Sequence, residues 1–118
     1  MRLICTLVAA GAVALLATSP AAPMSPPKLA GTVGPGFTIS LKHSGKAVKT
    51  LKAGSYTFVI SDKATIHNFV VEGPGVERDI TTPSFTGTKT VTIKLRKGKY
   101  KFYCRPHESS MFGFFKVI

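Results

Sequence analysis

Cysteine is scarce in this sequence. Only two occur among 118 residues, and one of them, Cys5, lies in an apolar N-terminal run. If that run is removed after synthesis, Cys104 stands alone and an internal disulfide is excluded. Small domains bury a limited fraction of their surface and are often stabilised by a disulfide or a metal ion. The scarcity of cysteine therefore directs attention to metal binding.

Acidic residues are also few. Five Asp and Glu stand against sixteen Lys and Arg, which leaves a formal net charge of +11. Such a surface attracts acidic partners or anionic cell-surface polymers. No nucleic-acid partner is expected, because the lysines are scattered and neither a recognition-helix pattern nor a stacking-aromatic motif is present.

Helical periodicity is missing as well. Beyond residue 30 no stretch has apolar residues at helical spacing, and no segment is repeated. Apolar and polar residues alternate instead, with the apolar sets Phe37, Ile39 and Leu41; Val91, Ile93 and Leu95; and Tyr100, Phe102 and Cys104. Turn signals such as Gly73-Pro74-Gly75 separate these segments. The pattern predicts about seven short antiparallel strands in a single all-β domain, a Greek-key β-sandwich.

The N-terminus has the features of an export signal. Met1-Arg2 precedes an apolar run over residues 3–17, and small residues follow up to Ala22. We expect a signal peptide over residues 1–22, cleaved after Ala21 or Ala22. An uncleaved membrane anchor is the alternative, although the run is shorter than the roughly 20 apolar residues of a spanning helix. The predicted location is therefore periplasmic, cell-surface or secreted, with no membrane span after cleavage.

The remaining chain divides into two parts. Residues 23–33 begin Pro-Met-Ser-Pro-Pro and are expected to form a Pro-rich spacer with few hydrogen-bond options. Residues 34–118 are expected to form the domain. Its Cys104 and Met111 flank a loop that also contains His107, and a further histidine, His67, lies upstream. A soft thiolate and a weak thioether suit copper better than zinc, calcium or magnesium. Two His, one Cys and a weak axial Met are the ligands of a blue-copper electron-transfer site.

Each of these residues has a plainer interpretation. Cys104 could be a buried, inert thiol, His107 a loop histidine and Met111 ordinary core packing. His67 could be a satisfied core histidine on an apolar strand, where it would share a face with Phe69. The short spacing from Cys104 to His107 favours ligands over these alternatives. A zinc site is less favoured, because Met is a poor zinc ligand and no fourth Cys or His is available.

The C-terminal pattern resembles that of the small cupredoxins, which include plastocyanin, amicyanin and pseudoazurin. The shared features are Cys104-Arg105-Pro106-His107, a Met a few residues later, a last apolar strand, and the pair His67-Asn68. The resemblance implies one copper ion, Cu(I) or Cu(II), with His67, Cys104 and His107 as equatorial ligands and Met111 as the axial one. It also implies that Asn68 ties the two ligand loops together by hydrogen bonds. The loop from His107 to Met111 is intermediate in length between those of amicyanin and plastocyanin.

The function expected from these features is that of an exported type 1 (blue) copper protein that carries one electron between redox partners. An enzyme is not expected, because no strong open coordination position remains for a substrate. Copper delivery, storage or detoxification without a dedicated electron-transfer partner is the alternative. A metal-free β-sandwich that serves as an interaction module is a third hypothesis.

The expected partner is a redox protein, acidic in character, and the protein itself is expected to be a monomer. In cupredoxins the C-terminal His ligand lies in an apolar surface patch, which here would include Pro35, Pro106 and Phe112 around His107. Outward-facing lysines such as Lys94, Lys99 and Lys101 would then steer the acidic partner by long-range attraction.

Overall fold

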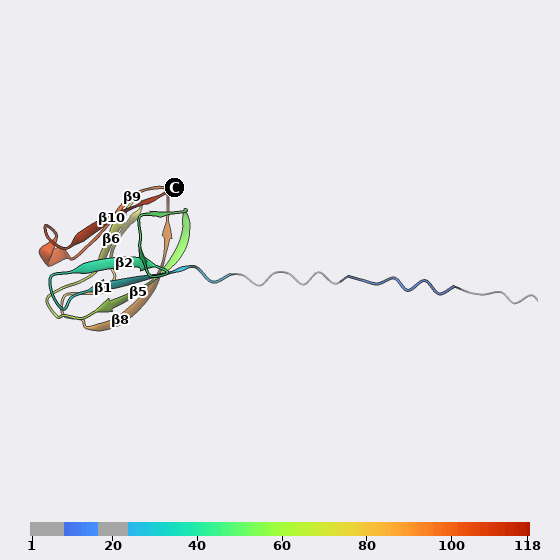
Figure 1. The fold of residues 1–118 in the computed structure, drawn as a ribbon, viewed down its shortest axis with the longest axis horizontal. Helices are drawn as coiled ribbons and strands as arrows, with labels where there is room; N and C mark the ends of the chain where they lie inside the picture. Colours follow the sequence, from blue (N-terminus) through green and yellow to red (C-terminus); the bar gives the residue numbers. More distant parts are fainter. Residues whose placement is uncertain (1–8, 17–23) are drawn as a thin grey trace, which may run out of the picture.

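Two facing β-sheets form the domain (Figure 1). The structure, a computed structural model, describes residues 9–16 and 24–118. One sheet has the strand order β3 (Lys46–Ala47), β2 (Ile39–His43), β1 (Lys28–Val33), β5 (Gly54–Asp62) and β8 (Gly87–Leu95). The other has the order β4 (Thr50–Leu51), β10 (Phe112–Val117), β9 (Gly98–Tyr103), β6 (Val70–Gly73) and β7 (Val76–Asp79). The predicted all-β sandwich is confirmed.

Strand directions differ in part from the expectation. Most neighbouring strands are antiparallel, but β1 runs parallel to β5 and β4 runs parallel to β10. Alternation along a strand reports which side chains face the core, and it carries no information about the direction of the neighbouring strand. The two parallel pairs could therefore not be read from the sequence pattern.

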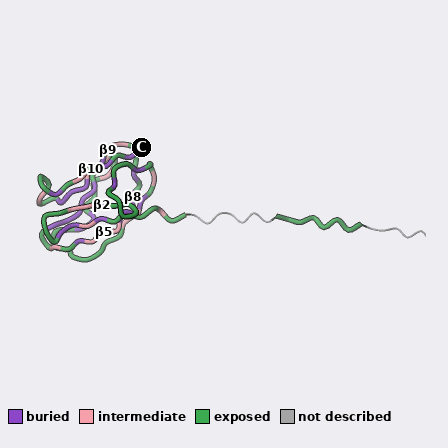
Figure 2. The backbone as a smooth tube through the Cα atoms, in the orientation of Figure 1, coloured by how far each residue is buried: buried purple, intermediate pink, exposed green. Residues whose placement is uncertain are grey.

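The core lies between the inner faces of the two sheets. Buried residues alternate with partly buried ones from Tyr56 to Asp62 of β5 (Figure 2), and Phe58 and Ile60 are fully buried. On the opposite sheet the ring of Phe102 stacks on that of Phe69, with centroids 5.8 Å apart and planes 4° from parallel. Such aromatic pairs stabilise a core beyond the area that they bury. Phe102 lies in β9, two residues before Cys104, and Phe69 directly precedes β6.

The domain begins earlier than predicted. The expected spacer over residues 23–33 is wrong from Lys28 onward, because β1 pairs with β5 along its whole length and Leu29 and Val33 are fully buried. Gly31 in this strand is a packing residue rather than a linker residue. A Cβ atom there would lie 2.4 Å from Cδ1 of Ile60 and 2.9 Å from Cε2 of Phe69. The small residues of β1 concealed its alternation.

The predicted signal peptide falls mainly on residues 1–8 and 17–22, which lie outside the described residues. Residues 9–16 contain no helix or strand. Export and cleavage therefore remain predictions. Within the described ranges, no helix is both long and apolar enough to cross a membrane.

The sandwich has two distinct ends. We call the end at which the chain enters β1 at Lys28 the tail end. The opposite end, called the loop end, carries the 3-10 helix η1 (Arg105–His107) between β9 and β10 (Figure 1). Strand β9 runs from the tail end to the loop end, and β10 returns beside it in the antiparallel direction.

Candidate metal centre

Four side chains with metal-binding atoms come from the loop end. Cys104 directly follows β9, His107 ends η1, and Met111 directly precedes β10. His67 lies in the turn before β6. Because β6 and β9 are antiparallel neighbours, with Val70 opposite Tyr103, the segment of His67 lies beside that of Cys104.

The three strongest donors converge on one point. Nδ1 of His67 lies 3.1 Å from Nδ1 of His107, and Sγ of Cys104 lies 3.7 Å and 3.6 Å from these two nitrogens. The circle through the three atoms has a radius of about 2.0 Å, close to metal–imidazole bonds of about 2.0–2.1 Å and somewhat short of metal–thiolate bonds of about 2.3 Å. The three side chains therefore fit one metal ion placed among them.

Burial keeps water away from most of the donors. Cys104 and His67 are fully buried and Met111 is 1 % exposed, whereas His107 is half-buried. Nε2 of His67 is buried and has no hydrogen-bond partner among the described residues. The ring of His67 thus points its Nδ1 toward His107 and Cys104, and no polar contact from the described part of the chain holds its Nε2. Among the described residues, Nδ1 of His67 contacts only His107 and Cys104, so it is the ring nitrogen available to a metal ion.

Backbone hydrogen bonds hold the loop between the donors. The N–H of His107 donates to the carbonyl of Cys104 at 3.1 Å, and the N–H of Met111 donates to the carbonyl of His107 at 2.8 Å. The N–H of Cys104 in turn donates to the carbonyl of Met111 at 3.0 Å. This closed set of bonds restrains three of the four side chains relative to one another.

Asn68 connects the two loops. Its Oδ1 accepts a hydrogen bond of 2.7 Å from the backbone N–H of Arg105, and its Nδ2 donates to Oδ2 of Asp79 at 3.4 Å. Nε of Arg105 donates to the same carboxylate oxygen at 3.1 Å. The hydrogen bond with Asp79 raises the pKa of Arg105, so the guanidinium stays charged. Arg105, the residue that directly follows Cys104, is thereby tied to the loop of His67.

Two expectations about local structure are wrong. His67 does not lie on a strand whose one face it shares with Phe69, because β6 begins only at Val70 and residues 67–71 are all buried, without alternation. Phe37 is not an inward strand residue, because β2 begins at Ile39 and Phe37 is 62 % exposed. Both errors come from extending a strand into the loop beside it.

Phe37 is the site residue that sequence reasoning missed. Its ring centroid lies 5.2 Å from that of His67 and 4.9 Å from that of His107, in edge-on arrangements. The available signal was Gly34-Pro35-Gly36, which marks a turn and places Phe37 in the loop at the end of β1. Gly34 has a φ of +74°, and a Cβ atom there would lie 3.1 Å from Cδ2 of His67. This loop therefore packs directly on the histidine.

The lysines are not placed as expected for steering a partner to His107. Lys94 lies opposite Ser55, near the start of β5, and Lys99 is the second residue of β9, so both lie toward the tail end. Lys101 lies nearer to the loop end, but its Nζ pairs with Oε1 of Glu108 at 2.9 Å. A local attraction of an acidic partner by these three residues around His107 is therefore not supported.

The β-sandwich and its cluster of two histidines, a cysteine and a methionine define a cupredoxin. A family model described as copper binding proteins, plastocyanin/azurin family, matches residues 38–118. The chain belongs to this family, and one copper ion is the cofactor that its donor set fits.

Individual relatives agree with this assignment. Amicyanin-alpha of Methylorubrum extorquens is 36% identical over 59 residues, which cover 48% of this chain and 50% of that protein. The chain therefore spans about half the length of this curated relative in the match. Two solved structures share the fold, each at 19% identity. Auracyanin A, a "blue" copper protein of Chloroflexus aurantiacus, has a TM-score of 0.55 over 80% of this chain and 100% of its own. The copper protein rusticyanin has a TM-score of 0.52 over 77% and 76%.

Proposed function

We propose that this protein is an exported type 1 (blue) copper protein that carries one electron between redox partners. The proposed ligands are His67, Cys104 and His107, with Met111 as a weaker fourth ligand and Asn68 as the residue that holds their loops together. The observation that carries the proposal is the convergence of two Nδ1 atoms and one Sγ atom at 3.1–3.7 Å. A thiolate with two imidazoles and a thioether is the donor set of such a site.

Bound copper would supply the Cu(I)/Cu(II) couple. The contribution of the protein is to keep the donors in nearly the same positions in both oxidation states. The hydrogen bonds among Cys104, His107 and Met111 serve this purpose, as does the bond from Arg105 to Asn68. A restrained site changes little on gain or loss of an electron, which favours rapid transfer over tight binding of one oxidation state.

We propose that the electron enters and leaves through His107, at the loop end of the domain. His107 is the one proposed ligand that is not fully shielded, and the exposed rings of Phe37 and Phe112 and of Pro35 and Pro106 lie in the same loops or flank them. We propose that a redox protein docks there through apolar contacts. Because the other donors are buried, no position is open to a substrate, and we propose that the protein is not an enzyme.

Further properties of the proposed carrier follow from the sequence. The net charge of +11 attracts an acidic partner at long range, even though the lysines do not surround His107. The apolar N-terminal run supports export. We propose a monomer, because an electron carrier exchanges partners through a surface that a stable dimer would cover.

Absorption spectroscopy tests the copper site. Full-length protein with one equivalent of Cu(II) should turn intensely blue, because the thiolate of Cys104 donates charge to the metal. Cys104→Ser should abolish the colour, whereas the matched replacement Cys5→Ser should leave it unchanged. A colourless copper complex, or a protein that takes up zinc and rejects copper, would refute the assignment.

Electrochemistry separates electron transfer from copper delivery or storage. A carrier should show a reversible one-electron wave and should retain its copper through repeated cycles. A protein that releases its copper to a chelator when it is reduced, without a reversible wave, would instead serve in delivery, storage or detoxification.

A further inference from the structure

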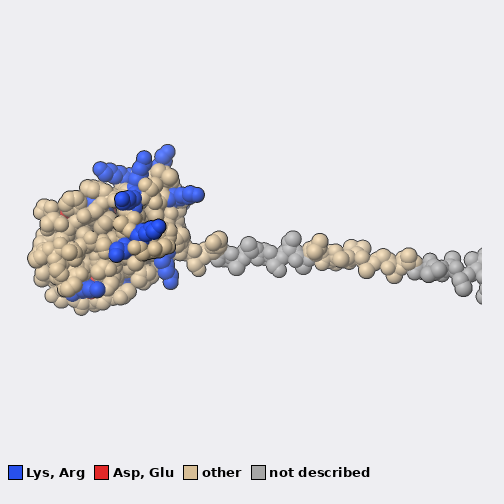
Figure 3. All heavy atoms as spheres, viewed as in Figure 1, with Lys and Arg blue, Asp and Glu red and all other residues tan. Residues whose placement is uncertain are grey.

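Basic residues are concentrated at the tail end. Figure 3 shows Lys and Arg gathered on the part of the domain from which the N-terminal tail leaves, while the opposite end of this face is largely free of them. The strand registers place ten exposed basic residues at or near this end: Lys28, Lys42, Lys46, Lys49, Lys52, Lys94, Arg96, Lys97, Lys99 and Lys116. We call this set the basic pole.

Acidic residues lie elsewhere. Asp62 is buried at the last position of β5, toward the loop end. Asp79 and Glu77 lie beside Arg105, and Glu108 pairs with Lys101. The fifth, Glu72, is opposite Lys101 in the register of β6 and β9. Among the described residues, no ion pair involves a member of the basic pole, so its charge is uncompensated.

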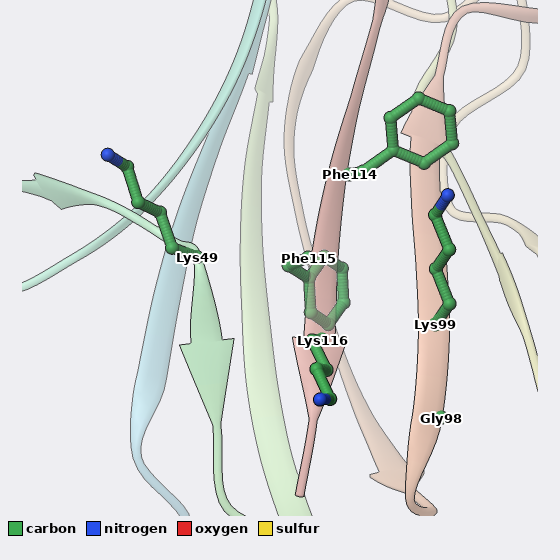
Figure 4. Close-up of a pocket in the computed structure, with 6 residues that line it drawn as sticks. All are labelled: Lys49, Gly98, Lys99, Phe114, Phe115 and Lys116. Atoms are coloured by element: carbon green, nitrogen blue, oxygen red, sulfur yellow. The ribbon is translucent and has the colours of Figure 1, made fainter.

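The basic pole also contains an apolar hollow. It has a volume of about 480 Å³ and is lined by Lys49, Gly98, Lys99, Phe114, Phe115 and Lys116. The ring of Phe114 is 49 % exposed, and Nζ of Lys99 lies 4.6 Å from its centroid. Figure 4 shows Lys49 and Lys99 on either side of β10, the strand that carries Phe114, Phe115 and Lys116. Ile118 at the end of the chain is also half exposed.

We propose that the basic pole binds an anionic lipid bilayer through its headgroups. Two observations favour a bilayer over a single acidic protein segment. The lysines are spread over strands of both sheets and so form a broad surface rather than a groove. Exposed Phe and Ile side chains among lysines suit the boundary between headgroups and acyl chains.

Binding of the basic pole to a bilayer would leave the loop end of the domain free. Because η1 lies at the opposite end from Lys28, the loop end with His107 would point away from the bilayer and remain free for a partner. The proposal goes beyond electron transfer and does not depend on it. Lipid binding is measured by sedimentation, and it should be the same for the copper-free protein.

Vesicle sedimentation tests the proposal. Full-length protein is mixed at low salt with vesicles of phosphatidylcholine alone or with about one third phosphatidylglycerol, an anionic lipid. We expect at least about tenfold tighter binding to the anionic vesicles, lost at about 0.5 M NaCl, where charges are screened. Lys49→Glu with Lys99→Glu should weaken binding by about tenfold or more, since each reversed charge removes an attraction and adds a repulsion.

A control double variant makes the same change in net charge at the loop end. Lys63 and Lys89 are exposed and lie near the loop end, and Lys63→Glu with Lys89→Glu should change binding by less than about threefold. Equal losses in the two double variants would overturn the proposal, as would equal binding to both kinds of vesicle. Binding of polyglutamate without binding to anionic vesicles would also overturn it, in favour of an acidic protein partner. If the Glu variant does not fold, Lys49→Gln with Lys99→Gln replaces it, with an expected loss of about threefold or more.

Discussion

At the scale of single residues, the site depends on a side chain that is not itself a proposed ligand. Asn68 is fully buried, and its Oδ1 is the acceptor for the backbone N–H of Arg105 at 2.7 Å. This bond joins the turn of His67 to the loop that follows Cys104. Because the two segments are far apart in the sequence, the bond restrains a contact that no local backbone bond could hold.

Asn68→Ala should therefore destabilise the protein and disturb the site. Removal of the amide leaves the N–H of Arg105 without its acceptor, at an expected cost of about 1–3 kcal/mol in the free energy of unfolding. Urea denaturation of the copper-free protein measures this cost, and the absorption spectrum with copper reports the site. Glu77→Gln, an exposed replacement in the same neighbourhood, should change the free energy of unfolding by no more than about 0.5 kcal/mol and should leave the spectrum unchanged. An unchanged spectrum and unfolding midpoint for Asn68→Ala would contradict the role given to this residue.

At the scale of elements, β1 decides where the domain begins. It lies between β2 and β5 in its sheet, so it shares backbone hydrogen bonds with a strand on each side. Its inward residues Leu29 and Val33 are fully buried. Loss of this strand would therefore open the middle of the sheet and not merely an edge.

Two shortened chains test this boundary. A chain that begins at Met24 should unfold at nearly the same temperature as the full-length protein, because β1 remains intact. A chain that begins at Gly34 should fail to fold, since the loss of Leu29 and Val33 alone removes about 1.5–3 kcal/mol of burial each, and the ladder bonds are lost as well. Small domains have only about 5–15 kcal/mol of total stability. Circular dichroism during heating follows the unfolding of both shortened chains. A cooperative transition in the chain that begins at Gly34 would show that β1 is dispensable.

At the scale of the whole molecule, charge and redox site are separated. The basic pole lies at the tail end, and the proposed ligands lie at the loop end. Two copies that meet through their loop ends keep their basic poles apart, yet both carry a large positive charge. Their encounter is therefore opposed by repulsion that salt can screen.

Electron self-exchange should accordingly become faster as salt is added. The Debye length falls from about 30 Å at 0.01 M to about 10 Å at 0.1 M, which weakens the repulsion between copies. Exchange with an acidic redox protein should show the opposite trend and become slower. NMR line broadening in mixtures of the oxidised and reduced protein measures self-exchange. A rate that falls as salt is added would mean that the copies attract one another, contrary to the charge distribution described here.

Local patterns explain which parts of the site were predictable. Cys104, His107 and Met111 lie within eight consecutive residues, so their spacing alone indicates a shared site. His67 was linked to them by its chemistry and by the family resemblance, and the register of β6 and β9 shows how it reaches them. Phe37 continues the alternation of Ile39 and Leu41, and this pattern predicts a strand position for it. Its contact with both histidines depends on how the loop before β2 folds over the loop end.

Residue types and their spacing within short segments are sufficient to predict the all-β class, the copper-type donor set and the strong positive charge. The tertiary structure alone decided that β1 belongs to the domain, that two strand pairs are parallel, and that the lysines gather away from His107. These features depend on which distant segments pair and in which register. Strand alternation repeats every two residues and cannot specify such long-range pairing.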